Sequence, residues 1–218
     1  MQSKDRSGYH VKLAPDALPF IGLGAALTGV TVFFSKPLAL LPLAFTVATA
    51  AFFRDPDRHL PTDEQCFYSA ADGRVLRVDE IDEPRFIGGR ALRIATFLSL
   101  VDVHINRTPV AGTVRYIEHV PGSFRPAWDA EADVANERNY VGLETEHGPV
   151  MVIQIAGLVA RRIVCRVGPG DAVQSGERIG MIKFGSRTDV LVPAGAARPL
   201  VTAGMKVFGG ITPIGAWQ

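Results

Sequence analysis

The sequence predicts a mainly β protein, an antiparallel β-sandwich or barrel-like domain with few short helices, preceded by an N-terminal hydrophobic helical hairpin. After about residue 54, short runs of apolar and β-branched residues alternate with polar ones and are separated by Gly, Pro and Asp/Asn clusters, which is typical of strands and turns. Before it, two long apolar segments follow one another. We therefore expect a polar tail over residues 1–14, a membrane-associated hairpin over 15–54 and a β domain over 55–218.

Composition narrows the functional classes. The chain has 218 residues with 23 Lys and Arg against 22 Asp and Glu, a net charge of +1, which argues against a nucleic-acid partner held by bulk charge. The two cysteines, Cys66 and Cys165, lie far apart and show no zinc-type spacing. We expect neither a disulfide framework nor a metal site, and a reducing compartment fits.

The apolar segments cover residues 17–34 and 37–53, and the only charged residues between Leu13 and Phe53 are Asp16 and Lys36. Each segment is slightly shorter than the ~20 residues that span a bilayer core, and each contains a proline. We expect a tight helical hairpin that spans the membrane thinly or dips into one leaflet. A buried helical pair inside a soluble core is the alternative.

Basic residues flank the hairpin on both sides and predict its orientation. They are Lys4, Arg6 and Lys12 before it, and Arg54 and Arg58 after it. The turn between the two apolar segments carries only Lys36. Because cytoplasmic loops are enriched in Lys and Arg, we expect both ends of the hairpin to stay cytoplasmic.

The β domain is expected to contain five clear strand runs. They cover residues 74–81, 91–99, 112–120, 140–147 and 149–167. The last run is long for one strand, so we expect a turn or bend near Gly157. Within this domain, only the stretch 127–136 is expected to be partly helical.

A Gly-Ser pair near the C-terminus, Gly185-Ser186, is the candidate for chemistry. It lies between two apolar, β-branched runs within residues 180–193. Glycine leaves its own carbonyl open to attack and tolerates strained backbone angles, and the next residue carries a hydroxyl. An ordinary turn between strands is the alternative interpretation, because Gly-Ser is common in turns.

Two further functional classes compete for this region. The spacing of Gly, Asp and Val over residues 167–186 is similar to that of biotinyl and lipoyl carrier hairpins, with Lys183 as the modified residue, although Lys183 lacks the neighbours typical of those carriers. A serine hydrolase using Ser186, His104 and Asp72 is the other class. The Gly-x-Ser-x-Gly elbow of many such hydrolases is absent around Ser186.

Several stretches together resemble one enzyme family. They are SAADGRV (69–75), FLSLVDVHINRTPVAGTV (97–114), VPGSF (120–124), NERN (136–139) and FGSR (184–187). Their order resembles that of the phosphatidylserine decarboxylases, specifically the short bacterial and archaeal type. The resemblance spans nearly the whole chain, including the apolar anchor.

This resemblance implies a self-processing enzyme. In the family, the serine hydroxyl attacks the preceding glycine carbonyl, and elimination and hydrolysis of the resulting ester leave a pyruvoyl group. Here that would give a β chain of 1–185 and an α chain of 186–218. The pyruvoyl carbonyl would form a Schiff base with the substrate amine and draw off electrons as CO2 departs, so that neither pyridoxal phosphate nor a metal is needed.

The resemblance also implies the substrate and the location. Phosphatidylserine in the bilayer would be converted to phosphatidylethanolamine, in phospholipid biosynthesis. An anchored catalytic domain on the cytoplasmic face of the inner membrane follows from a substrate that lies in the bilayer. The sequence is compatible with a homo-oligomer.

Two partners of Ser186 are implied by the same motifs. Asp72 matches the family carboxylate that, with a histidine, activates the serine, and His104 matches the histidine motif. A histidine's pKa near neutrality suits proton transfer. Longer family members have a second histidine where this chain has Arg107, so that either His104 serves both self-cleavage and turnover, or another group such as His119 takes one step.

Three arginines are candidates for holding the substrate phosphate or carboxylate. They are Arg107, Arg138 and Arg187. A guanidinium group matches either oxyanion with two hydrogen bonds. Structural ion pairs or a solvated face are equally consistent with these positions.

Overall fold

The computed structural model describes residues 11–60, 63–129, 131–158, 162–183 and 185–218. The chain divides into two compact units, Met1–Arg58 and His59–Gln218. The division falls four residues after the expected one, because β2 (Arg54–Pro56) pairs with β1 (Val11–Leu13) and so belongs to the first unit. Lys4 and Arg6, two of the residues used to predict orientation, lie outside the described residues.

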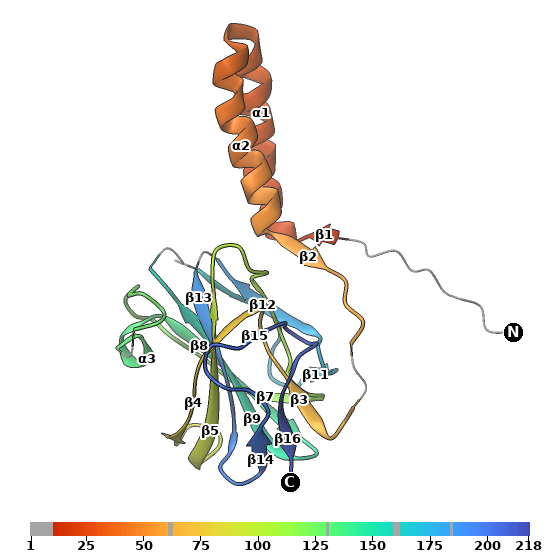
Figure 1. The fold of residues 1–218 in the computed structure, drawn as a ribbon, viewed down its shortest axis with the longest axis vertical. Coiled ribbons are helices and arrows are strands. Elements are labelled where there is room, and N and C mark those ends of the chain that lie inside the picture. The colour runs from red at the N-terminus through yellow and green to blue at the C-terminus, as the bar shows by residue number, and fades with distance from the viewer. Residues whose placement is uncertain (1–10, 61–62, 130, 159–161, 184) are drawn as a thin grey trace, which may run out of the picture. The chain divides into compact units, whose positions relative to one another are not determined.

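The first unit is built on two antiparallel helices, α1 (Leu18–Phe34) and α2 (Lys36–Phe52) (Figure 1). A 3-10 turn, Pro15–Ala17, precedes α1, and the Ser35 hydroxyl caps α2 by accepting from Leu38 N–H. The predicted helical pair is confirmed. Together with its leading turn, α1 forms a helix over Pro15–Phe34 that is long and apolar enough to cross a membrane.

The apolar side chains of this helical pair are largely exposed. Those of α1 and α2 exposed by two fifths or more include Leu18, Leu23, Phe33, Phe34, Leu41 and Val47. Helices in the core of a soluble protein bury such side chains, so the alternative of a buried helical pair does not fit.

The second unit is almost entirely antiparallel β structure. Its strands are β3 (Cys66–Tyr68), β4 (Gly73–Glu83), β5 (Gly89–Leu98), β6 (Ile105–Arg107), β7 (Gly112–Val120), β8 (Arg138–Thr145), β9 (Gly148–Ala156), β10 (Ile163–Cys165), β11 (Ala172–Val173), β12 (Arg178–Ile182), β13 (Ser186–Pro193), β14 (Ala197–Pro199), β15 (Lys206–Val207) and β16 (Pro213–Trp217). An eight-stranded sheet has the order β11-β7-β8-β9-β13-β5-β4-β15, and β10-β12-β6 and β14-β16-β3 form two smaller sheets. The mainly β fold predicted from the sequence is confirmed.

Two irregular segments of the second unit were also predicted, a bend near Gly157 and a partly helical stretch over 127–136. The long run over 149–167 does break at Gly157, since β9 ends at Ala156 and β10 begins at Ile163. The stretch 127–136 contains one short helix, α3 (Ala132–Ala135). Both features therefore agree with the expectation.

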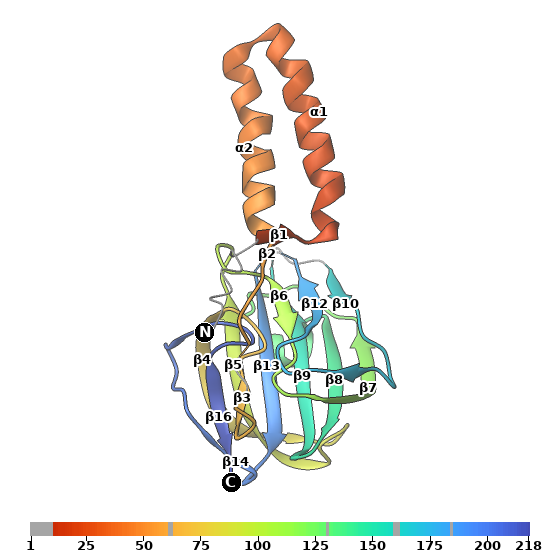
Figure 2. The ribbon, with the colours of Figure 1, turned by 90° about the vertical axis from the view of Figure 1, so that its right-hand side faces the viewer.

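The eight-stranded sheet is buried on both faces near its middle. Figure 2 shows β13 between β5 and β9, where it pairs with both. Side chains of successive strand residues point to opposite faces. Val190 and Val192 join the large core on one face, whereas Leu191 joins a smaller cluster on the other.

Candidate active site

The Gly185-Ser186 bond lies at the end of the central strand. Ser186 is the first residue of β13 and is opposite Leu98, the last residue of β5, and Ala156, the last residue of β9. The Ser186 side chain is fully buried, and its Oγ has no hydrogen-bond partner within the described part of the chain. Gly185 has a φ of +66°, in the left-handed region that glycine adopts at little cost.

His104 is brought to this bond from the segment before β6. Its ring is fully buried, its Nδ1 lies 2.9 Å from the carbonyl oxygen of Asp102, and its Nε2 lies 3.3 Å from Gly185 N–H. A carbonyl oxygen only accepts, so Nδ1 carries the proton, and the lone pair on Nε2 accepts from Gly185. The hydrogen-bond pattern thus assigns a neutral histidine whose basic nitrogen contacts the backbone amide of Gly185, one peptide before the scissile bond.

The Asp102 carboxylate is held by its own set of donors. Ser99 donates its backbone N–H and its hydroxyl, and Lys206 donates its ammonium group. Burial alone would raise the pKa of Asp102, but the hydrogen bonds from Lys206 and Ser99 hold that pKa below its ordinary value. This anchored anion fixes the backbone carbonyl that orients His104.

Asp72 lies at the same end of the sheet. It immediately precedes β4, which is separated from β13 by β5 alone, and the strand registers put Asp72 about two strand spacings, roughly 10 Å, from Ser186. Its carboxylate is buried, and Oδ1 accepts from Gly209 N–H at 2.8 Å. The structure therefore brings Ser186, His104 and Asp72 to one end of one unit.

Of the three candidate arginines, Arg138 and Arg187 lie near each other and both bind Asp133, whereas Arg107 lies apart from them. Arg187 follows Ser186 along the strand, so its side chain points to the opposite face. Arg138 shares that face and donates to the hydroxyl of Tyr140 at 2.8 Å. Arg107 lies in another sheet, where Nη1 donates to Gly176 O at 2.9 Å. Their assignment to substrate binding stays a prediction.

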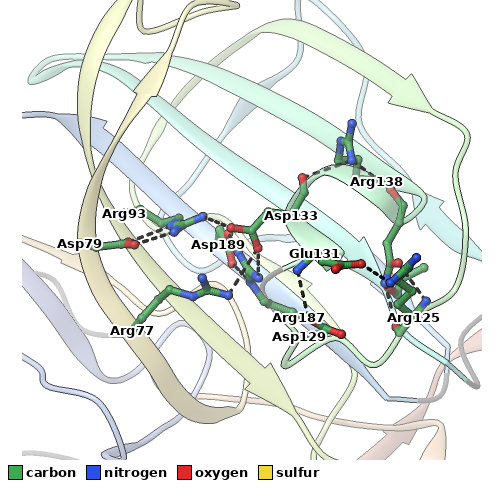
Figure 3. Close-up of polar contacts among 12 residues, drawn as sticks. Arg77, Asp79, Arg93, Arg125, Asp129, Glu131, Asp133, Arg138, Arg187 and Asp189 are labelled. Carbon is green, nitrogen blue, oxygen red and sulfur yellow. Dashed lines mark hydrogen bonds and ion pairs between the residues drawn. The ribbon is translucent and has the colours of Figure 1, made fainter.

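Arg187 belongs to a buried ion cluster, which agrees with the structural ion pair that the sequence analysis gave as an alternative for this residue (Figure 3). Its guanidinium group is fully buried between Asp189, 2.7 Å from Arg187 Nε, and Asp133. Asp133 lies on α3 and also binds Arg93 at 2.7 Å and Arg77 at 3.4 Å. Burial opposes the charge on Arg187, but the two aspartates raise its pKa above the ordinary arginine value.

On the Ser186 face, a chain of buried side chains connects three strands to β6. Asn106 donates to Thr188 Oγ1 at 3.0 Å and accepts from Gln154 Nε2 at 2.9 Å, and Asn139 donates to Gln154 Oε1 at 3.0 Å. All four side chains are buried. Because β6 also follows His104 directly, this chain fixes His104 relative to β13.

Asn136, the first residue of the NERN stretch, ties the α3 segment to the site. Its amide donates to the carbonyl oxygens of Arg125 and Ala156, both at 2.8 Å, and its Oδ1 accepts from Arg125 N–H. Ala156 is the residue opposite Ser186. The matching NERN motif was the one sequence signal for this contact.

The structure separates His119 from this site. His119 lies on β7, three strands from β13 and so about 14 Å away, with 51% of its side chain exposed and Nε2 3.8 Å from Glu137 Oε1. Lys183 is half-buried, and the β12 and β13 strands on either side of it pair in different sheets. A carrier lysine at the tip of a hairpin is therefore not formed here.

No group of three or more His, Cys, Asp or Glu side chains among the described residues is placed to hold a metal ion. The groups described at the Gly185-Ser186 bond are a hydroxyl, an imidazole and a glycine peptide in the left-handed conformation.

Comparison with known proteins assigns this arrangement to a family. A family model described as phosphatidylserine decarboxylase matches residues 45–215. A phosphatidylserine decarboxylase proenzyme of Symbiobacterium thermophilum is 47% identical over 93% of this chain and 94% of its own length. The protein of the same description from Carboxydothermus hydrogenoformans is 46% identical over 82% of this chain and 84% of its own length. The one from Beijerinckia indica is also 46% identical, over 91% of this chain and 86% of its own length.

Proposed function

Because this chain belongs to the phosphatidylserine decarboxylase family and is thus a decarboxylase, we propose that it cleaves itself at Gly185-Ser186 and uses the resulting pyruvoyl group to decarboxylate phosphatidylserine. The products would be phosphatidylethanolamine and CO2. The description of its relatives as proenzymes is consistent with activation by cleavage.

The burial of Ser186 is the observation that carries this proposal. A serine hydrolase must present its hydroxyl to an external substrate, whereas Ser186 is fully buried and its Oγ has no hydrogen-bond partner among the described residues. Burying a hydroxyl without a partner costs free energy, and a catalytic role is one recognised reason for keeping such a group. The carbonyl of the preceding residue, Gly185, is an electrophile adjacent to this hydroxyl in the chain.

His104 would be the base for this attack. With Nδ1 donating to Asp102 O, its Nε2 lone pair accepts from Gly185 N–H, the amide one residue before that of Ser186. We propose that Nε2 takes the Ser186 hydroxyl proton when that hydroxyl replaces the amide as its partner. The Oγ–carbonyl bond then forms, and the Gly185-Ser186 C–N bond breaks as the nitrogen is protonated. Removal of the Ser186 α-proton expels Gly185 as a carboxylate, and hydrolysis of the remaining enamine releases ammonia.

A pyruvoyl group fits the residues that surround this position. The new chain end would remain the first residue of β13, buried beside His104, where water is excluded. When present, the group supplies an electron-withdrawing carbonyl that accepts the electron pair left by CO2. His104 could return a proton to the carbon that loses CO2, because its Nε2 lies at Gly185, the residue next to this chain end.

Asp72 would support the charge that His104 gains. Its buried carboxylate lies at the same end of the sheet and is fixed by Gly209 N–H. A negative charge in a region of low dielectric stabilises a nearby imidazolium. The alternative base, His119, receives no support from its exposed position on β7.

The location follows from the substrate. Phosphatidylserine is a bilayer lipid, and Pro15–Phe34 has the length and composition of a membrane-crossing helix. We propose attachment to the inner membrane, with the catalytic unit on the cytoplasmic face, the two chains staying together after cleavage.

Release of CO2 from carboxyl-labelled phosphatidylserine tests this function. The purified protein should release labelled CO2, whereas Ser186→Ala should remain one chain and release none, because it lacks the attacking hydroxyl. Ser175→Ala, at a half-buried serine away from the scissile bond, is the matched control and should behave like the wild type. Decarboxylation by uncleaved Ser186→Ala would refute the proposal.

A further inference from the structure

Large apolar side chains are exposed on the loops beside the scissile bond. Leu100 and Val101, after β5, are 54% and 78% exposed, and Leu158, after β9, is 59% exposed. Trp128, on the segment after β7, is 61% exposed. Single exposed apolar residues are ordinary, but a group of four beside a buried reactive serine is not.

These side chains come together at Gly185. Leu98 and Ala156, which end β5 and β9, are both opposite Ser186, so the loops that follow them emerge at the scissile bond. A Cβ placed on Gly185 would lie 4.0 Å from Leu100 Cδ2. We call Leu100, Val101, Trp128 and Leu158 the loop surface.

Gly157 and Ala127 link the other two members to the same point. Gly157, just before Leu158, lies so close to the Gly185 carbonyl oxygen that it has no room for a Cβ. A Cβ on Gly157 would also lie 3.2 Å from the Cβ of Ala127, the residue before Trp128. The loop surface therefore lies around the scissile bond rather than along a remote edge.

Cationic side chains lie next to the loop surface. Arg162 is exposed and Lys183 is half-buried, and their backbones are joined by the hydrogen bond from Lys183 N–H to Arg162 O. Protein surfaces that bind anionic membranes combine apolar side chains, which enter the acyl-chain region, with cationic side chains, which are attracted to the lipid head groups. Tryptophan also favours this interface, because its ring is apolar and its indole N–H is polar.

We propose that the loop surface inserts into an anionic phospholipid bilayer and that lipid head groups reach the Ser186 position directly from that bilayer. This inference rests on the proposed function, because it concerns how a bilayer lipid reaches the site. A bilayer is favoured over a protein partner because the same chain carries a helix able to cross a membrane. Leu100 and Val101 would contact acyl chains, with Arg162 and Lys183 at the phosphates.

Fluorescent labels on the full chain in phosphatidylserine-containing vesicles test this inference. A polarity-sensitive dye is attached to Val101→Cys or Leu158→Cys, each in a Cys66→Ala, Cys165→Ala background. Glu146→Cys, in the exposed turn at the opposite end of β9, is the control. Dye at positions 101 and 158 should shift to the blue and be quenched by lipids brominated on their acyl chains, and dye at 146 should not.

Two outcomes would overturn the inference. Labels at 101 and 158 that behave like the label at 146 would show that the loop surface stays in water. A blue shift without quenching by brominated lipids would show that it packs against protein, such as a second copy of the chain.

Kinetics separate this inference from the proposed function. Val101→Asp combined with Leu158→Asp should lower kcat/KM for phosphatidylserine in vesicles about tenfold, because charged side chains resist insertion. Activity on a water-soluble, short-chain phosphatidylserine should be unchanged. Equal loss on both substrates would refute a role in membrane contact, whereas no activity of the wild type on either substrate would instead refute the proposed function.

Discussion

Substitution of His104 tests which residue is the base for self-cleavage. If Nε2 is the base for attack, His104→Ala should leave the chain uncleaved, with self-cleavage slowed by a factor on the order of 100 or more. Denaturing gel electrophoresis of the freshly purified protein measures this directly. A variant that cleaves normally but releases no CO2 would limit His104 to turnover.

His119→Ala is the matched control for that experiment. Its ring is half exposed on β7 and near Glu137, so its removal should leave both cleavage and turnover at wild-type rates. Loss of cleavage in His119→Ala, with His104→Ala unaffected, would reverse the assignment of the base.

Gly185 allows the effect of backbone strain to be measured without a steric clash. A Cβ there would meet only Leu100 Cδ2, at 4.0 Å, but φ is +66°, where a Cβ costs about 1–2 kcal/mol. Gly185→Ala should therefore still fold. Its self-cleavage should be slower, by roughly tenfold if that cost shifts the peptide away from its reactive geometry. A time course of cleavage after synthesis is the measurement.

Gly157→Ala should slow self-cleavage more than Gly185→Ala does, because the Cβ added at position 157 would collide with the Gly185 carbonyl oxygen. Cleavage of Gly185→Ala at the wild-type rate would show that the left-handed conformation plays no part in the reaction.

Sequence motifs identified the candidate site better than they identified its supporting residues. Ser186, His104 and Asp72 lie in recognisable stretches, and the fold brings them to one end of the sheet. The direction of Arg187 follows from strand alternation, but only once the face of Ser186 is known. Partners such as Asn106 and Thr188 lie 82 positions apart, and their meeting depends on a register that no local pattern contains.

Helix α3 owes its position to ion pairs rather than to its own stability. Four residues make too short a helix to persist alone, and Asp133 holds it against Arg77, Arg93 and Arg187 (Figure 3). Burial tends to raise the pKa of Asp133, but Arg187 and Arg93 hold that pKa below its ordinary value. The stabilisation is therefore present above about pH 4 and is lost as pH falls through the lowered pKa.

Asp133→Asn should destabilise the second unit at neutral pH by about 2 kcal/mol, because it leaves buried guanidinium groups short of a charged partner. Denaturant unfolding of the variant and the wild type at pH 7 and near pH 3 measures the effect, and the difference should shrink at the lower pH. Glu131→Gln, in an exposed pair with Arg125, should change stability by less than about 0.5 kcal/mol. A difference between Asp133→Asn and wild type that persists unchanged in acid would contradict the ionic explanation.

Among the elements, long strands and apolar helices were predictable and short pairings were not. The alternation in β4, β5, β7, β8 and β9 indicates strands directly, as does the apolar length of α1. The pairing of β1 with β2 joins two three-residue segments across the hairpin and leaves no such pattern. For the same reason the sequence placed residues 11–13 in a tail, whereas their backbone is paired.

The position of β13 predicts that the two chains remain one particle after cleavage. Residues 186–193 pair with β5 on one side and β9 on the other, and β15 and β16 pair with β4 and β3. Lys206 also binds Asp102 across the two chains. Cleaved protein should elute as one species in size-exclusion chromatography in mild detergent and give two bands only after denaturation, and spontaneous separation of the bands would contradict this.

Intact-mass spectrometry of the purified, active protein tests self-processing at Gly185-Ser186 most directly. It should detect residues 1–185 ending in a free carboxylate and residues 186–218 lighter by one ammonia than a chain beginning with serine, with that end blocked to Edman sequencing. An active protein consisting of a single full-length chain would contradict the proposal. So would a smaller chain that begins with an intact serine amine, which is the product of ordinary proteolysis.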